Sequence, residues 1–198
     1  MSNFKTKHFV LLALYVAIEI IIATTPLGSV PIGPVVATIA HLPVLIAAFT
    51  LPKNGGLIMG FVFGLLSFLV WTFMPPSPIA FLFTPFHSLA NMPNSYLSLV
   101  VCFAPRMIFG FVADIIVAKA KSYPVLVVTS LVTSAIHSLL FVLFAYLFFN
   151  EAISAIFGTT GLIAFLTLII VPNGLAEIAL AGFVIPPLAL AINRIIKK

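Results

Sequence analysis

The basic residues of this 198-residue chain are confined to positions that one face of a membrane would hold. Long apolar runs fill the sequence, and only Arg106 among the nine Lys and Arg residues lies inside such a run. Short loops that carry Lys and Arg stay on the cytoplasmic side of a membrane. The other basic residues precede the first run, follow the second and the fourth, or close the chain: Lys5, Lys7, Lys53, Lys119, Lys121, Arg194, Lys197 and Lys198. This distribution predicts an integral membrane protein with an even number of spans and both termini in the cytoplasm.

The composition excludes a soluble fold. A mean hydropathy of +1.31 with 7% charged residues leaves too little polar surface, so lipid has to surround most of the exterior. The formal net charge of +5 does not indicate nucleic-acid binding, because the basic residues are spread over loops and ends, where they meet lipid headgroups. The single cysteine, Cys102, has no CxxC or His-rich neighbourhood, so the sequence predicts neither a disulfide nor a metal site there.

The first apolar run has two interpretations. Basic residues followed by an apolar stretch in residues 5–23 are typical of a signal peptide. Glu19 interrupts the stretch, however, and no small-x-small cleavage site closes it. These two features favour a retained first helix.

The apolar runs predict an all-α, polytopic membrane protein: a single six-helix bundle over residues 1–198. A helix needs about 20 residues to cross roughly 30 Å of hydrocarbon at about 1.5 Å per residue. Five clear runs cover residues 7–25, 34–51, 56–73, 97–118 and 123–149. We predict that a sixth helix starts near Pro172, after an apolar outer segment at residues 158–171. The alternative is one long helix that is kinked at Pro172.

Two outer connections are longer than the cytoplasmic turns. Residues 27–34 join the first two predicted helices, and residues 74–96 join the third and fourth. Five prolines exclude a regular helix from most of the second connection, while Phe81, Phe83 and Phe86 give it apolar surface to bury. We expect this loop to pack down as a lid.

The few polar residues inside the predicted spans share one layer. Counted from the helix ends, Glu19, His41 and Arg106 lie roughly 9–14 Å below the outer surface. His137 falls in the middle to outer half of the fifth helix, and Asn173 and Glu177 lie near the start of the sixth. Ionisable residues within a membrane are costly and usually mark a pathway or a site. Their convergence predicts an outward-facing polar pocket.

Each of these residues also has a purely structural interpretation. Glu19 and Arg106 could neutralise one another as a buried pair. A single buried histidine is usually hydrogen-bonded within the bundle, and Asn173 could cap the backbone that Pro172 interrupts. Asp114, in the inner half, is predicted to be structural. No HxxxH, CxxC or paired-carboxylate spacing indicates a metal site, and no cofactor is predicted.

Small residues form two further patterns. Gly56, Gly60 and Gly64 give GxxxGxxxG in the third span, which predicts close helix packing inside the bundle. Ala13 and Ala17 give AxxxA in the cytoplasmic half of the first span, where a partner subunit could dock. No GxxxxGK[ST] motif is present, so energy for transport would have to come from a partner or an ion gradient.

Several motifs, in order along nearly the whole chain, resemble those of one transporter family. They are Pro31-Ile32-Gly33-Pro34 leading into Thr38-Ile39-Ala40-His41-Leu42-Pro43, the turn Pro52-Lys53-Asn54-Gly55-Gly56, Pro105-Arg106, and Pro172-Asn173-Gly174 followed by Glu177. Together they resemble the substrate-binding S component of energy-coupling factor (ECF) vitamin transporters, most closely the pantothenate type.

This resemblance implies a bacterial plasma-membrane protein with a pocket under its outer loops. It also implies that Ala13 and Ala17 contact a membrane coupling subunit that sits on two ATP-binding subunits, and that the bundle topples to release a vitamin inward. The candidate substrate-binding residues are Arg106, Asn173, His41, Thr38, Glu177, His137, Asn91 and His87.

The available side chains suit pantothenate, a small anion with a carboxylate, two hydroxyls and an amide. One arginine can hold a carboxylate with two hydrogen bonds, and Asn or His can serve the other groups. A larger acid such as folate stays possible. Two other functions also stay open: a membrane-embedded enzyme that uses His41, His137 and Glu177 for acid–base chemistry, and an assembly protein without a ligand.

Overall fold

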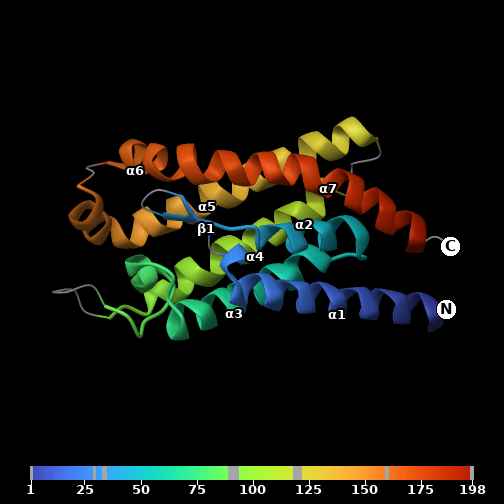
Figure 1. The fold of residues 1–198 in the computed structure, drawn as a ribbon, viewed down its shortest axis with the longest axis horizontal. Helices are drawn as coiled ribbons and strands as arrows, with labels where there is room; N and C mark the ends of the chain where they lie inside the picture. The colour runs from blue at the N-terminus through green and yellow to red at the C-terminus, as the bar shows by residue number, and fades with distance from the viewer. Residues whose placement is uncertain are drawn as a thin grey trace.

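The computed structural model describes residues 2–28, 30–32, 35–88, 94–117, 122–158 and 161–196. The helices lie lengthwise beside one another, and both chain termini lie at the same end of the bundle (Figure 1). The long helices are α1 (Ser2–Thr24), α3 (Gly55–Phe73), α4 (Leu97–Val117), α5 (Tyr123–Phe157) and α7 (Leu175–Ile196), and the shorter ones are α2 (His41–Thr50) and α6 (Leu162–Ile169). The prediction of a helical bundle is confirmed for the described residues.

A short β-hairpin stands where the second helix was predicted to begin. Strand β1 (Val30–Ile32) pairs antiparallel with β2 (Val35–Ala37), and α2 starts only at His41. The β-branched pair Val35-Val36 favours extended backbone, which explains why the helix does not begin at residue 34. The predicted boundary of this span is therefore wrong. Ten residues in α2 rise only about 15 Å, roughly half the thickness of the hydrocarbon.

Five helical stretches in the described part of the chain are long and apolar enough to cross a membrane. They are Thr6–Thr24, Gly55–Phe73, Leu97–Val117, Tyr123–Phe157 and Leu162–Ile196. The predicted outer segment at residues 158–171 does not precede a separate helix, because one 35-residue stretch runs from Leu162 to Ile196. The alternative of one long helix is confirmed, and Pro172, where a kink was predicted, lies in a π-helical turn within it.

Pro172 is accommodated within that stretch by a π-helical turn, η3 (Ile170–Gly174), between α6 and α7. Proline cannot donate to the carbonyl four residues earlier, and its ring clashes there. The backbone widens instead, so that the amide of Leu175 donates to the carbonyl of Ile170, five residues back. Similarly, α5 continues past the predicted end at residue 149, and the backbone leaves helical geometry at Phe149 itself (φ −135°, ψ 28°).

Glycines bring α3 and α4 into direct backbone contact, as the GxxxGxxxG pattern predicted. A Cβ atom added to Gly60 would collide with the carbonyl oxygen of Arg106, and one added to Gly110 would collide with that of Gly56. Asp114 of α4 accepts hydrogen bonds from the amides of Gly56 (2.8 Å) and Leu57 (3.0 Å) at the start of α3. These amides have no partner within their own helix, so Asp114 has the structural role predicted for it.

Replacing Gly60 with leucine is expected to separate α3 from α4, because the added side chain has no room beside the backbone of Arg106. Overpacking of this kind should lower the free energy of unfolding by about 3 kcal/mol. Thermal unfolding in detergent measures the loss. Leu65→Phe, at an exposed position of the same helix, serves as the control. A wild-type melting temperature for Gly60→Leu would show that the two helices are not held at this distance.

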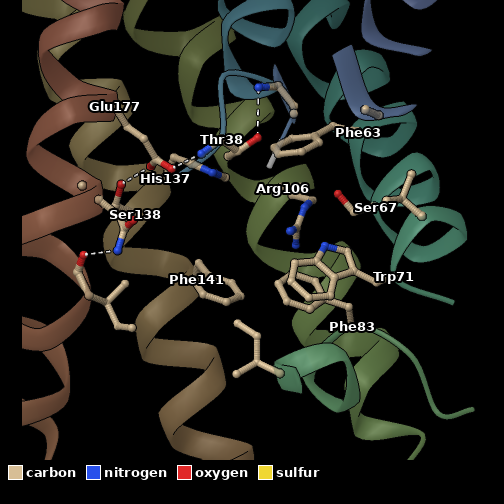
Figure 2. Close-up of a pocket in the computed structure, with 18 residues that line it drawn as sticks. Thr38, Phe63, Ser67, Trp71, Phe83, Arg106, His137, Ser138, Phe141 and Glu177 are labelled. Carbon is tan, nitrogen blue, oxygen red and sulfur yellow. Dashed lines mark hydrogen bonds between the residues drawn. The ribbon is translucent and has the colours of Figure 1, made fainter. Parts of the chain in front are cut away.

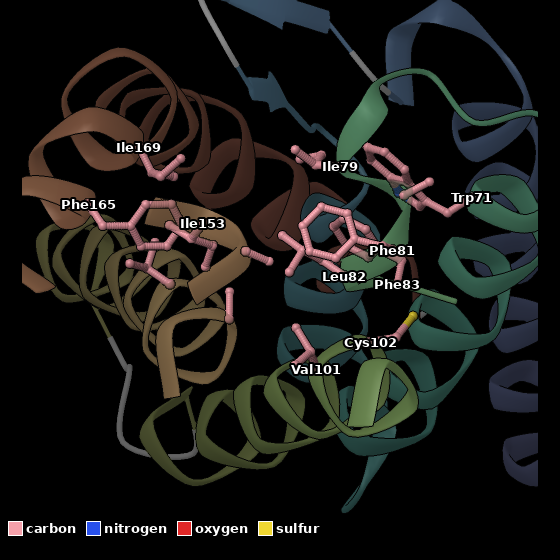
Figure 3. Packing of buried hydrophobic residues seen from close by; sticks show 14 residues of the cluster. Trp71, Ile79, Phe81, Leu82, Phe83, Val101, Cys102, Ile153, Phe165 and Ile169 are labelled. Carbon is pink, nitrogen blue, oxygen red and sulfur yellow. The ribbon is translucent and has the colours of Figure 1, made fainter. Parts of the chain in front are cut away.

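The connection between α3 and α4 packs against the bundle through a 3₁₀ helix, η2 (Pro78–Leu82). The ring of Phe83 stacks on Trp71 with centroids 4.2 Å apart, and Phe81 meets Phe149 edge-on at 5.8 Å. Figure 3 shows these loop side chains in one cluster with residues of α4, α5 and α6. The prediction that the loop packs down is confirmed for Phe81 and Phe83, whereas Phe86 is 66% exposed.

Candidate functional site

A pocket lies next to η2, between α3, α4, α5 and the η3–α7 region (Figure 2). It is partly open to the surface, and residues of the turn after α1 and of the segment before α2 complete its lining. Pockets for small molecules commonly combine an apolar lining with a few polar groups. This pocket has that character, because Phe63, Trp71, Phe83 and Phe141 line it beside a small polar set.

Arg106 supplies a positive charge to the pocket from the middle of α4. Its side chain is 5% exposed, and one terminal nitrogen, Nη1, donates to the backbone carbonyl of Cys102 at 2.6 Å. The guanidinium carbon lies 4.8 Å from the ring centroid of Phe63 and 5.1 Å from that of Phe83, so aromatic faces surround the cation. Its Nε has no hydrogen-bond partner among the described residues. Arg106 therefore retains unused donor capacity.

No hydrogen bond or close ion pair joins Glu19 to Arg106 among the described residues, although the two side chains interact electrostatically. Glu19 on α1 is 0% exposed, and neither of its carboxylate oxygens has a hydrogen-bond partner in the part of the chain that the structure describes. No ion pair joins Arg106 to any carboxylate within those same residues. A buried guanidinium without an anionic partner is costly, and an anion bound in the pocket would supply one.

Glu177 of α7 is joined to two distant segments. One carboxylate oxygen accepts from the backbone amide of Thr38 at 2.8 Å, and the other accepts from the hydroxyl of Ser138 at 3.0 Å. Figure 2 shows these three residues on one side of the pocket, across from Trp71 and Phe83. The residue just after the hairpin is thereby attached to both α5 and α7.

Two histidines stack behind this contact. The rings of His41 and His137 lie 5.6 Å apart at an angle of 11°. Nδ1 of His41 lies 2.9 Å from the carbonyl oxygen of Thr38, so that nitrogen carries the hydrogen, and Nε2 accepts from Ser134 at 3.2 Å. Both nitrogens of His41 are thus occupied within the protein. His137 lines the pocket, and its Nδ1 has no partner among the described residues.

Asn173 presents an unused acceptor from the π-helical turn. Its side-chain nitrogen, Nδ2, donates to the carbonyl of Ile169 at 3.4 Å. Its side-chain oxygen, Oδ1, is buried and has no partner in the described part of the chain, and the residue is only 3% exposed. A buried acceptor of this kind costs free energy until a donor reaches it.

The structure brings most of the candidate residues together. Five of the eight line the pocket: Thr38, Arg106, His137, Asn173 and Glu177. His41 lies behind the wall, and His87 bonds to the carbonyl of Thr72 at 3.0 Å without lining the pocket. Asn91 lies outside the described residues.

Sequence reasoning missed the aromatic lining and two serines, Ser67 and Ser138. A signal existed for Ser138, because Ser134, His137 and Ser138 follow a spacing of three and four residues and so share one face of α5. No comparable signal marked Phe63, Trp71 or Phe141, since aromatic residues are common throughout the spans.

Ala13 and Ala17 lie on the outer surface of α1. Both are exposed, whereas Tyr15 and Glu19 on the opposite side of the helix are buried against the bundle. Figure 1 shows α1 along one edge of the molecule. The AxxxA face is therefore free of the chain's own helices within the described residues.

The pocket chemistry suits a small organic anion with hydrogen-bonding groups. It offers a cation, an unused acceptor, an imidazole and aromatic surfaces for apolar parts of the ligand. The described residues contain no group of three His, Cys, Asp or Glu side chains placed to hold a metal ion.

Comparison with known proteins identifies the family. The sequence profile of the family described as "ECF transporter, substrate-specific component" matches residues 7–189. The pantothenic acid transporter PanT of Lactococcus lactis subsp. cremoris (strain MG1363) shares 27% identity over 201 residues, which cover 98% of this chain and all of that protein. The apolar helices fit a multi-pass membrane protein, and the chain belongs to the family of substrate-specific components of ECF transporters, which are transport proteins.

Proposed function

We propose that this chain captures pantothenate at the outer side of the plasma membrane. The observation that carries the proposal is the guanidinium of Arg106, which lines the pocket without a carboxylate partner among the described residues. The relative PanT is a pantothenic acid transporter, and pantothenate supplies one carboxylate to complete this site. Arginine holds a carboxylate with two parallel hydrogen bonds, which gives both affinity and orientation.

The remaining groups of pantothenate find partners further along the pocket. Asn173 Oδ1 accepts from the amide or from a hydroxyl, and His137 Nδ1 serves a second polar group. Phe63, Phe83 and Phe141 cover the methyl groups. Thr38 and Glu177 complete the wall, and His41 supports it from behind. His87 and Asn91, in the connection between α3 and α4, stay candidate substrate contacts in this proposal.

We infer that six passes place both termini, and all Lys and Arg residues except Arg106, in the cytoplasm. The location of both termini at one end of the bundle supports an even number of passes (Figure 1). In this orientation η2 and the hairpin face outward, and positively charged segments face the cytoplasm. The second pass is made by β2 and the short helix α2 together.

The energy for import comes from other subunits in this proposal. A membrane coupling subunit docks on the exposed Ala13–Ala17 face of α1, two ATP-binding subunits drive it, and the bundle topples to deliver the vitamin inward. Small residues permit the close approach of helices in lipid, which supports this face as the docking site.

Mass spectrometry of the chain purified in mild detergent tests the substrate. We expect pantothenate to dissociate from the wild-type protein and to be missing from Arg106→Ala purified in parallel. Folate or another vitamin acid in the wild-type sample would assign a different substrate within the same family. A lipid-derived product that depends on His137 would overturn the transport assignment for this pocket.

A further inference from the structure

Three segments that are far apart in the sequence meet at the carboxylate of Glu177. Thr38 follows β2, Ser138 belongs to α5, and Glu177 lies on α7. The two oxygens of Glu177 accept from these two partners at 2.8 and 3.0 Å, and its side chain is buried. Unlike Arg106 or Asn173, Glu177 has no unpartnered buried atom among the described residues. Glu177 therefore differs from Arg106 and Asn173, whose unpartnered buried atoms are available to a ligand.

The backbone of Thr38 is held on both sides. Its amide donates to Glu177, and its carbonyl accepts from His41, whose other nitrogen bonds to Ser134 on α5. The hydroxyl of Thr38 accepts from the amide of Ala40 at 3.1 Å. Helices α5 and α7 thus fix the chain where it leaves the hairpin and begins α2.

This fixed segment forms one wall of the pocket. Thr38 and Ala40 line the pocket together with Ala23 and Gly28 from the end of α1 and the turn that follows it, η1 (Pro26–Gly28). The hydrogen bond to Glu177 is the one that joins the Thr38 amide to α7 in the described structure, so its loss would free this amide from α7. Movement of the segment would open the pocket on the side of the hairpin.

We propose that Glu177 is a positioning residue, which controls how fast substrate reaches and leaves the pocket by holding the amide of Thr38, and which does not itself bind the substrate. The inference rests on the proposed function, because the substrate used to measure the rates is pantothenate. It assigns Glu177 a role that differs from direct contact with the ligand.

Rates of binding distinguish the two roles. In Glu177→Ala, both the association and the dissociation rate of radiolabelled pantothenate should rise about tenfold, the factor expected when the Thr38 amide loses its bond to a charged group, while the affinity changes only a few fold. Glu177→Gln keeps an acceptor for the Thr38 amide and should restore rates close to those of the wild type. Leu180→Ala, at an exposed position one turn along α7, is the control for damage to the helix.

A second variant removes the donor and leaves the carboxylate in place. Thr38→Pro lacks the backbone N–H, and the extended conformation of Ala37 in β2 suits a residue that precedes proline. This variant should show the same faster rates, and adding Glu177→Ala to it should change them little further. A lower affinity caused only by faster dissociation, with unchanged association, would overturn the proposal and assign Glu177 to the substrate.

Hydrogen exchange tests the contact without any ligand. In the ligand-free wild-type chain the amide of Thr38 should be protected, and Glu177→Ala should raise its exchange rate about tenfold or more. Unchanged exchange would overturn the positioning role even if the variant binds normally. Failure of the wild-type chain to bind pantothenate would instead contradict the proposed function, and the exchange experiment would still decide the role of Glu177.

Discussion

Replacing Arg106 with alanine is expected to abolish measurable pantothenate binding while the chain stays folded. A buried charge-assisted pair contributes about 3 kcal/mol, which corresponds to at least roughly a 100-fold loss of affinity. Arg106→Lys should recover only part of the affinity, because a single ammonium cannot reproduce two parallel hydrogen bonds. Isothermal titration calorimetry in detergent measures both variants.

Arg194→Ala provides the matched control for Arg106→Ala, because Arg194 is exposed near the end of α7. It should bind like the wild type. If Arg106→Ala fails to fold, the stability of the double variant Glu19→Gln with Arg106→Gln tests whether a lost pair between Glu19 and Arg106 is the cause. The structure shows no bond between these two side chains, so the double variant should be no more stable than Arg106→Gln alone. Retained affinity in a folded Arg106→Ala protein would remove Arg106 from the site.

Replacing both Ala13 and Ala17 with leucine is expected to abolish ATP-dependent uptake in proteoliposomes while the isolated chain keeps its affinity within a few fold. Both alanines are exposed on α1, away from the residues that line the pocket. Close helix contact in lipid depends on small side chains, and two leucines would hold the coupling subunit away. Uptake and copurification with the coupling subunit should fail together.

The control for this variant is Val128→Leu with Val132→Leu, an exposed pair with the same four-residue spacing on α5. It adds similar apolar bulk to a face that we do not assign to the coupling subunit, and uptake should continue. Normal uptake in the variant with leucine at both positions 13 and 17 would show that this face of α1 contacts only lipid.

The sequence predicted the helical bundle because hydrophobicity dominates a chain that lipid surrounds. It failed where local backbone chemistry competes with hydrophobicity. Val35 and Val36 are apolar enough for a span, yet they form a strand, and Pro172 was expected to mark a helix start although a π-helical turn accommodates it. Hydropathy does not distinguish these backbone conformations, since it reports only how readily a side chain transfers from water to an apolar environment.

The polar part of the pocket was predictable for a related reason. Ionisable groups such as Arg106 and Glu177 are rare inside spans, so each one stands out against the apolar background. Their partners were not predictable, because the hydrogen bond from Thr38 to Glu177 joins residues that are 139 positions apart. Glu19 illustrates the same limit, since its depth matched that of Arg106 although no bond joins them in the described structure.

Calorimetric comparison of pantothenate with pantothenol tests the central claim most directly. In pantothenol a hydroxymethyl group replaces the carboxylate, and the rest of the molecule is unchanged. We predict that the wild-type chain binds pantothenate and binds pantothenol at least about 100-fold more weakly, because the alcohol leaves the guanidinium of Arg106 buried without an anion. Equal affinity for the two compounds would contradict the assignment of Arg106 to the carboxylate, and no binding of either would contradict pantothenate as the substrate.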